Sequence, residues 1–173
     1  MASASIKSIA AGELPKYVRQ NILGAEFLQG FDRVLRGIEN KLVSEFQVEC
    51  LSKLDVLPVI DRSAGNVASL LLNSLCSYPL GERVDIKGLS IDELVVAGEL
   101  TGVKFERSII SSLYAESSDL TDVEFDQASY VVSLHMDKDT RVGGTFPIPT
   151  WIETPDRTIS GKGEVEKLLH KHQ

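Results

Sequence analysis

Hydrophobic residues in the first part of the chain follow helical spacing. From Phe27 to Phe46 they recur at steps of three and four, which places them along one face of a helix. This pattern predicts one amphipathic helix over residues 27–46. The earlier apolar group between Leu14 and Leu23 predicts a separate short helix, with Gly24 as the break. The Ser- and Ala-rich start of the chain is expected to be frayed.

A further helix is predicted over residues 67–75, where the apolar residues again share one face. Ser63 is its expected N-cap, and Pro79 and Gly81 follow its end, since neither residue continues a helix easily. Between the helices, the apolar stretch LDVLPVI (residues 54–60) has a central proline. It is therefore expected to be a connector or a poor strand.

The pattern changes after Val84, where helical spacing gives way to an apolar residue at every fifth position. Five residues turn a helix by roughly 500°, so successive apolar side chains would point about 140° apart and share no buried face. A helix is therefore excluded for this region. The repeating apolar positions are Leu100, Phe105, Ile110, Ala115, Leu120, Phe125 and Tyr130.

Each five-residue unit has its own internal order. The residue two before each apolar centre is uncharged, and residues two apart lie on the same side of a strand. The residue between them is mostly polar, and polar pairs such as Thr121–Asp122 and Asp126–Gln127 follow the centres. The unit is thus three extended residues and a two-residue corner. A chain of such units winds into a coil with a filled interior.

This pattern resembles the pentapeptide-repeat family, and residues 118–122 (SDLTD) are the closest match to its repeat. The resemblance implies a right-handed, four-sided β-helix with about four repeats per coil. It covers residues 84–134, and so two to three coils. A meander of short strands is the alternative. Coils are expected to be irregular because Ala115 is small for a centre and bulky residues replace the family's alanine at Val103, Leu113 and Val123.

We therefore predict an α+β fold in which N-terminal helices cap a short β-helix-like body. The expected regions are a helical cap over 1–83, the repeats over 84–135, and an extended segment with a short C-terminal helix over 136–173. A short coil leaves both ends of its core open, and such ends normally require caps. The helices would supply one cap. The segment around Trp151 would cover the other end or one side.

A weaker resemblance concerns the order of these regions. A helical part, degenerate five-residue repeats and a Pro-Trp-Ile-like segment are similar in layout to the C-terminal regions of bacterial NACHT-type (STAND) defence ATPases. The Gly-x-x-x-x-Gly-Lys-Ser/Thr motif of their motor does not occur in this sequence. The resemblance implies a separate sensor or partner subunit in antiviral defence or signalling.

Composition limits the function classes. The 173 residues are 43% hydrophobic, carry a net charge of -7 and have a pI near 5.0, which argues against a general nucleic-acid binder. The sequence shows neither the apolar run of a signal peptide nor a membrane span, so a bacterial cytoplasm is the expected location. Cys50 and Cys76 have no CxxC spacing and are expected to be free, buried thiols.

Candidate chemistry is sparse. His135 is close in sequence to Asp137 and Asp139, but a solvated turn is the favoured interpretation over an acid–base or cation site. His170 and His172 belong to the C-terminal tail, and a zinc site needs more ligands than this pair. We find no phosphate-binding loop and no nucleophile with a paired base. No enzyme activity, cofactor or metal is therefore predicted.

The leading hypothesis is a non-enzymatic interaction or scaffold module that binds a protein partner or a second copy of itself. Some pentapeptide-repeat proteins resemble duplex DNA in size and charge, so an acidic DNA mimic that inhibits a nucleic-acid enzyme is the alternative. An enzyme built on His135 and Asp137 is a third possibility. The candidate partner-binding residues are Asp119, Asp122, Glu124, Asp126 and Trp151.

Overall fold

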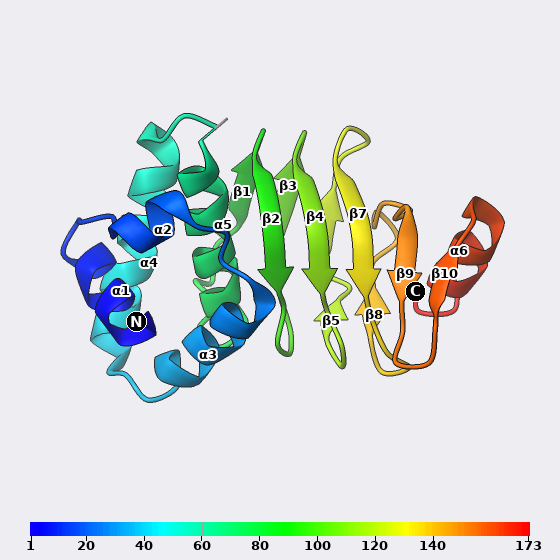
Figure 1. The fold of residues 1–173 in the computed structure, drawn as a ribbon, viewed down its shortest axis with the longest axis horizontal. Helices are drawn as coiled ribbons and strands as arrows, with labels where there is room; N and C mark the ends of the chain where they lie inside the picture. Colours follow the sequence, from blue (N-terminus) through cyan, green and yellow to red (C-terminus); the bar gives the residue numbers. More distant parts are fainter. Residues whose placement is uncertain (60) are drawn as a thin grey trace.

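The computed structural model describes residues 1–59 and 61–173, and helices occupy one end of an elongated molecule (Figure 1). Helix α5 is the centre of this helical end, since almost all of its residues are buried, and α2, α3 and α4 pack against it. Among the described helices, none is long and apolar enough to cross a bilayer. The helices of this end are α1 (Ala2–Ala10), α2 (Lys16–Gln20), α3 (Ala25–Leu35), α4 (Asn40–Val56) and α5 (Arg62–Leu75).

The helix predicted over residues 27–46 is two helices. The chain reverses between α3 and α4, around Gly37, and the rings of Phe31 and Phe46 come together with their centroids 5.5 Å apart. Both rings are fully buried. The apolar spacing continues through the reversal because both helices face the same core, so periodicity alone could not show the break.

Two smaller expectations also change, and a third holds in part. The chain start is not frayed but forms α1, whose Ile6 and Ile9 are fully buried. The N-cap of α5 is Asp61, whose carboxylate accepts the backbone N–H of Ser63 at 2.9 Å. The stretch 54–60 begins inside α4 and then becomes a connector, and its last residue lies outside the described residues.

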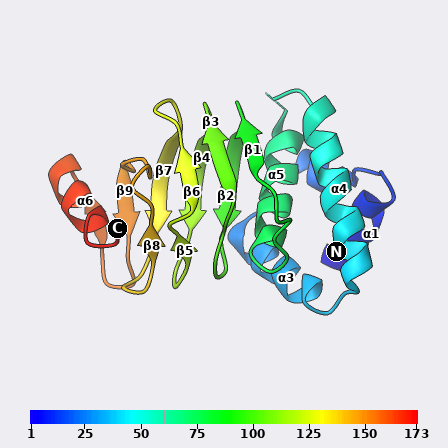
Figure 2. The ribbon, with the colours of Figure 1, turned by 180° about the vertical axis from the view of Figure 1, so that it is seen from behind.

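The second part of the chain is a β-solenoid of about four turns (Figures 1 and 2). One parallel sheet contains β1 (Val84–Lys87), β3 (Val103–Glu106) and β6 (Val123–Phe125). A second contains β2 (Ser90–Val95), β4 (Ile109–Tyr114), β7 (Tyr130–His135) and β9 (Trp151–Glu153), all parallel, with β10 (Thr158–Ser160) antiparallel at its edge. A third contains β5 (Asp119–Leu120) and β8 (Arg141–Val142).

The strand register confirms the coil. Val84 pairs with Val103, and Val103 in turn pairs with Val123, so one coil spans about four five-residue units. The α+β fold with a β-helix-like body is confirmed, and the meander is wrong because the strands pair in parallel with the preceding coil. The expected two to three coils were too few, since winding continues past residue 135 to β9.

Equivalent side chains stack inside the solenoid. The rings of Phe105 and Phe125 lie nearly parallel with centroids 4.8 Å apart, and Phe146 meets Phe125 edge-on at 5.1 Å. All three are buried. This column arises because parallel register places each coil's inward residues directly over those of the previous coil.

The predicted inward position of Tyr130 is wrong. Its side chain is 60% exposed, whereas Ser129 and Val131 are buried. The apolar centre Ile110 pairs with Val131 rather than with Tyr130, so this coil has gained one residue at the corner that follows Phe125. Since strand side chains alternate between faces, a shift of one residue turns Tyr130 outward.

The two ends of the solenoid contact different elements. At the first coil, Ser69 and Asn73 of α5 donate side-chain hydrogen bonds to the carbonyls of Glu93 (2.6 Å) and Val95 (3.2 Å) on β2. A methyl group at Gly65 would collide with the carbonyl oxygen of Ser90, so α5 approaches β2 this closely only through glycine. At the last coil lie β10 and α6 (Lys162–Leu169).

The phenylalanine column yields a stability prediction. Phe105→Ala should lower the free energy of unfolding by about 3–5 kcal/mol, because it leaves a cavity between two coils. Tyr130→Ala, at a position that the five-residue pattern treats as equivalent, should cost less than about 0.5 kcal/mol. Urea denaturation followed by circular dichroism measures both. Equal losses for the two variants would contradict the outward placement of Tyr130.

Candidate interaction surface

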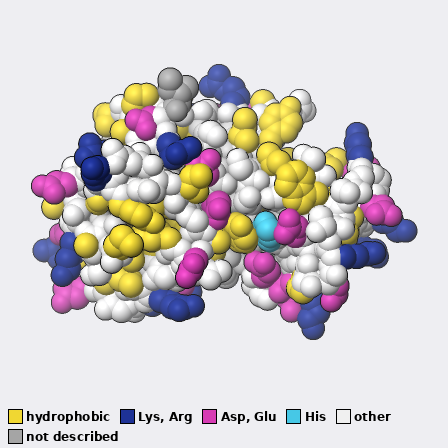
Figure 3. All heavy atoms as spheres, viewed as in Figure 1, with side chains coloured by type: hydrophobic (Ala, Val, Ile, Leu, Met, Phe, Trp, Pro, Cys, Tyr) yellow, Lys and Arg dark blue, Asp and Glu magenta, His cyan; other side chains and the backbone are white. Residues whose placement is uncertain are grey.

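Three large apolar side chains form an exposed group on the solenoid, which we call the apolar patch: Ile109, Tyr130 and Ile148. They are 43%, 60% and 47% exposed, whereas their apolar neighbours in sequence Ile110, Val131 and Phe146 are buried. Figure 3 shows hydrophobic side chains gathered over the upper ends of β4 and β7. Exposed apolar groups of this kind often mark binding surfaces.

The parallel pairing of β4 with β7 positions two residues of the patch. Ile109 and Tyr130 begin β4 and β7 and are register partners, so they stand side by side on successive coils. The backbone N–H of Tyr130 donates to the carbonyl of Ser108 at 2.9 Å, which holds it in the ladder. Ile148 lies in the irregular segment between Phe146 and β9. Beside the patch is a hollow of about 370 Å³ whose lining includes Asp126, Tyr130, Thr145, Pro147 and Ile148.

Aspartate side chains form hydrogen bonds that link the corners of successive coils. Asp122, Asp126 and Asp137 each accept a backbone N–H from the preceding coil at 2.8–3.1 Å. Each donor residue has a positive φ, which exposes its N–H at the corner. Hydrogen bonds to an ionised carboxylate are stronger than neutral ones. The donors are Gly102 (φ 66°), Arg107 (φ 50°) and Ser117 (φ 51°).

The four predicted acidic residues do not form one charged row. Asp122 and Asp126 hold corners, as described above. Asp119 on β5 accepts bonds from Thr121 and pairs with Arg141 at 3.2 Å, and Glu124 on β6 pairs with Arg83 at 3.2 Å. These two strands belong to different sheets. Hydrogen bonds from Thr121 lower the pKa of Asp119, and those from Ser129 and Arg107 lower that of Asp126, so both carboxylates are ionised at neutral pH.

Trp151, the fifth predicted residue, is half-buried on β9 opposite Ser133 of β7. It follows Ile148 by three residues, and Asp126 lines the hollow beside Tyr130. The structure therefore places Asp126 at the hollow beside the apolar patch, and Trp151 on the strand that pairs with β7. It leaves Asp119 on a different sheet from the patch strands.

His135 does not pair with Asp137. Its Nδ1 lies 3.2 Å from Oε2 of Glu153, and its ring stacks on Tyr114 with centroids 4.1 Å apart. Burial, followed by the charges of nearby glutamates, raises the pKa of Tyr114. Within residues 1–59 and 61–173, no group of three or more His, Cys, Asp or Glu side chains is arranged to hold a metal ion.

Both cysteines are free thiols, as the sequence predicts. Cys50 is fully buried on α4, and Cys76 is partly buried just after α5. Burial raises the pKa of both thiols, that of Cys76 to about 11. Neither thiol is therefore ionised, or reactive as a nucleophile, near neutral pH.

Comparison with known proteins returns no relative. No family model matches the chain, and neither the curated proteins nor the solved structures contain a match.

The five-residue pattern does not predict the apolar patch, because it places Tyr130 among the buried centres. The buried serines carried a usable signal. Ser108 and Ser118 are ten residues apart, but the next equivalent, Ser129, comes eleven later, which marks the extra residue. The Ser129 hydroxyl accepts the N–H of Ser108 at 3.2 Å, and this confirms their equivalence.

Asp137 yields a pH prediction. Hydrogen bonds from Ser117, Asp139 and Thr140 hold the pKa of its carboxyl far below its usual range. The folded state therefore binds this proton less readily than the unfolded state, so its contribution is present at neutral pH and is lost as the pH falls below about 4.

Asp137→Asn should accordingly lower the free energy of unfolding at pH 7 by about 1 kcal/mol, a modest value because the carboxylate is in contact with water. The difference between wild type and variant should shrink on going from pH 7 to pH 3. Thermal melts across this range measure it. A difference that stays constant or grows in acid would contradict the role of the ionised carboxylate.

Proposed function

We propose that the chain is a non-enzymatic protein–protein interaction module, in which the solenoid is a rigid support and the apolar patch contacts the partner. The observation that carries the proposal is the exposure of Ile109, Tyr130 and Ile148 as neighbours beside a hollow. Tyrosine is among the residues that contribute most to binding energy at interfaces. The hollow offers a pocket for a side chain of the partner.

We further propose that the solenoid belongs with the pentapeptide-repeat proteins and that the helices cap its first coil. Coils of about four five-residue units support the first statement, and the hydrogen bonds from α5 to β2 support the second. A capped solenoid fits a partner or sensor subunit in a bacterial cytoplasmic defence or signalling complex. The layout of helices, degenerate repeats and the Trp151 segment is the support for that role.

The alternative of an acidic DNA mimic has less support. Such a mimic needs carboxylates presented in one row, whereas Asp119 and Glu124 lie on different sheets and are paired with arginines. Neutralising Asp122 or Asp126 would also remove a corner bond to Gly102 or Arg107. A loss of inhibition in those variants would thus be difficult to separate from a loss of stability.

The proposal is tested by making the patch polar. Ile109→Ser with Tyr130→Ser should reduce capture of any specific partner from the native cell at least tenfold, since two central interface side chains typically contribute more than about 1 kcal/mol each. Quantitative mass spectrometry of cross-linked pull-downs measures the loss. Analytical ultracentrifugation over a concentration series shows whether the partner is a second copy.

Val56→Ser is the matched control, because Val56 is 76% exposed at the end of α4 and lies outside the patch. It should behave as wild type. Circular dichroism melts must show that all three proteins are equally folded. If the patch variant retains the partner set and oligomeric state of wild type, the patch is not the contact surface.

A further inference from the structure

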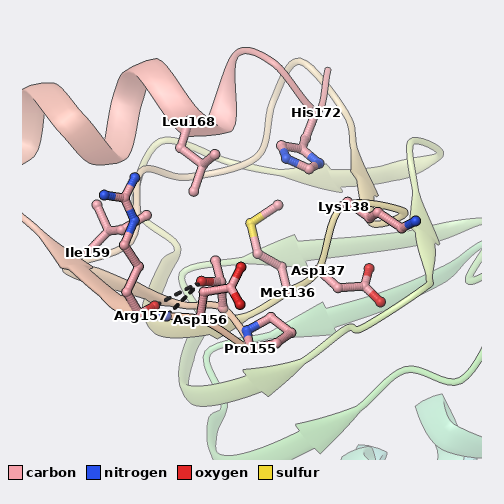
Figure 4. Close-up of a pocket in the computed structure, with 10 residues that line it drawn as sticks. Met136, Asp137, Lys138, Pro155, Asp156, Arg157, Ile159, Leu168 and His172 are labelled. Carbon is pink, nitrogen blue, oxygen red and sulfur yellow. Dashed lines mark hydrogen bonds between the residues drawn. The ribbon is translucent and has the colours of Figure 1, made fainter.

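A second, separate cavity of about 500 Å³ lies between the last coil and the C-terminal segment (Figure 4). It shares no lining residue with the hollow beside Tyr130. Its volume falls within the range of small-molecule sites. It is lined by residues that follow β7, by the turn before β10, and by α6 with the residues after it, so packing of the C-terminal segment forms it.

The cavity has an apolar wall. Met136 and Ile159 are buried, and Leu168 of α6 is partly buried against the same core. Figure 4 shows these three side chains together with Pro155 around the open space. Met136 is the inward residue of its coil, over Ala115, so part of the solenoid interior is accessible from the cavity. This wall suits the apolar body of a ligand.

Two cations flank the apolar wall. Figure 4 places Arg157 and Lys138 on opposite sides of Met136. In the part of the chain that the structure describes, neither side chain has an ion pair or a hydrogen bond. An adjoining hollow shares Arg157 and adds Lys167 and Lys171, with Glu164 as its one carboxylate. This end thus has unpaired positive charge, although the chain as a whole carries -7.

The carboxylates at the cavity offset this charge only in part. Asp137 already accepts bonds from Ser117, Asp139 and Thr140, so its charge is stabilised within the coil. The Asp156 side chain forms no ion pair or hydrogen bond among the described residues, and it would repel a bound anion. Arg157, Lys138, Lys167 and Lys171 outnumber the three carboxylates of the two hollows, Asp137, Asp156 and Glu164.

His172 fixes the remaining wall. Its Nδ1–H donates to the carbonyl of Thr140 at 2.7 Å, and its own carbonyl accepts the N–H of Val142 at 3.0 Å. These bonds attach the chain end to the last coil. Figure 4 shows the imidazole at the edge of the cavity, where Nε2 is the ring nitrogen that makes no bond within the described chain.

We propose that this cavity binds a small amphiphilic anion, a carboxylate or phosphate monoester with an apolar body. Met136, Ile159 and Leu168 contact the apolar body, and the positive potential from Arg157 on one side and Lys138 on the other attracts the anionic head. The site is independent of the apolar patch and does not rest on its role in partner binding.

Octyl phosphate, octanoate and octylammonium test the proposal because they share one apolar chain and differ in charge. Titration calorimetry of the whole chain should give a Kd of about 1 mM or tighter for the two anions, and binding at least tenfold weaker for octylammonium. Amide NMR shifts should fall on residues 136–140, 154–159 and 168–172. No binding of either anion at about 10 mM, equal binding of the cation, or shifts elsewhere would overturn the proposal.

Variants that each remove one charge show whether that charge strengthens or weakens octanoate binding. Arg157→Gln and Lys138→Gln should each weaken octanoate binding about threefold, whereas Asp156→Asn should tighten it about threefold. Arg33→Gln, at an exposed position of α3 at the helical end, should leave binding unchanged. A stronger effect of Arg33→Gln than of Arg157→Gln, or weaker binding by Asp156→Asn, would show that the head group is not held at this cavity.

Discussion

The parallel register between successive coils is the constraint on which the rest of the structure depends. Each coil places its backbone N–H and C=O groups opposite those of its neighbours, so one set of ladder bonds fixes every side chain in the coil. Inward residues then stack in columns such as Phe105–Phe125–Phe146. Polar corner residues of successive coils also lie above one another. Aspartate carboxylates there accept hydrogen bonds from corner N–H groups of the preceding coil.

The same constraint explains the candidate interaction surface. A regular coil would direct the residue at position 130 inward, but the corner after Phe125 holds one more residue than the corner below it. The buried serines and the buried apolar residues stay aligned with those of the previous coil. The extra residue therefore lies in the exposed corner. Tyr130 then begins its strand facing outward beside Ile109. A local irregularity in an otherwise repetitive body thus exposes an aromatic side chain.

The ends of the coil explain the rest of the molecule. A parallel solenoid has unpaired strand edges and an open core at each end, and both must be covered. Helix α5 approaches β2 through Gly65 and bonds to its carbonyls, while β10 turns antiparallel and α6 follows it. The C-terminal segment covers its end less completely, and the space that remains over Met136 is the cavity flanked by Arg157 and Lys138.

The sequence by itself determined the helical first part and the coiled second part, because the helical and the five-residue spacings are both set by local backbone geometry. It also indicated corners at Asp122 and Asp126 and free cysteines. Only the tertiary structure decided the reversal between α3 and α4, the outward position of Tyr130, the engagement of the acidic side chains and the cavity at the C-terminal end. These depend on which residues lie across from one another on different helices or coils, and the five-residue period alone does not show such pairs once one corner gains a residue.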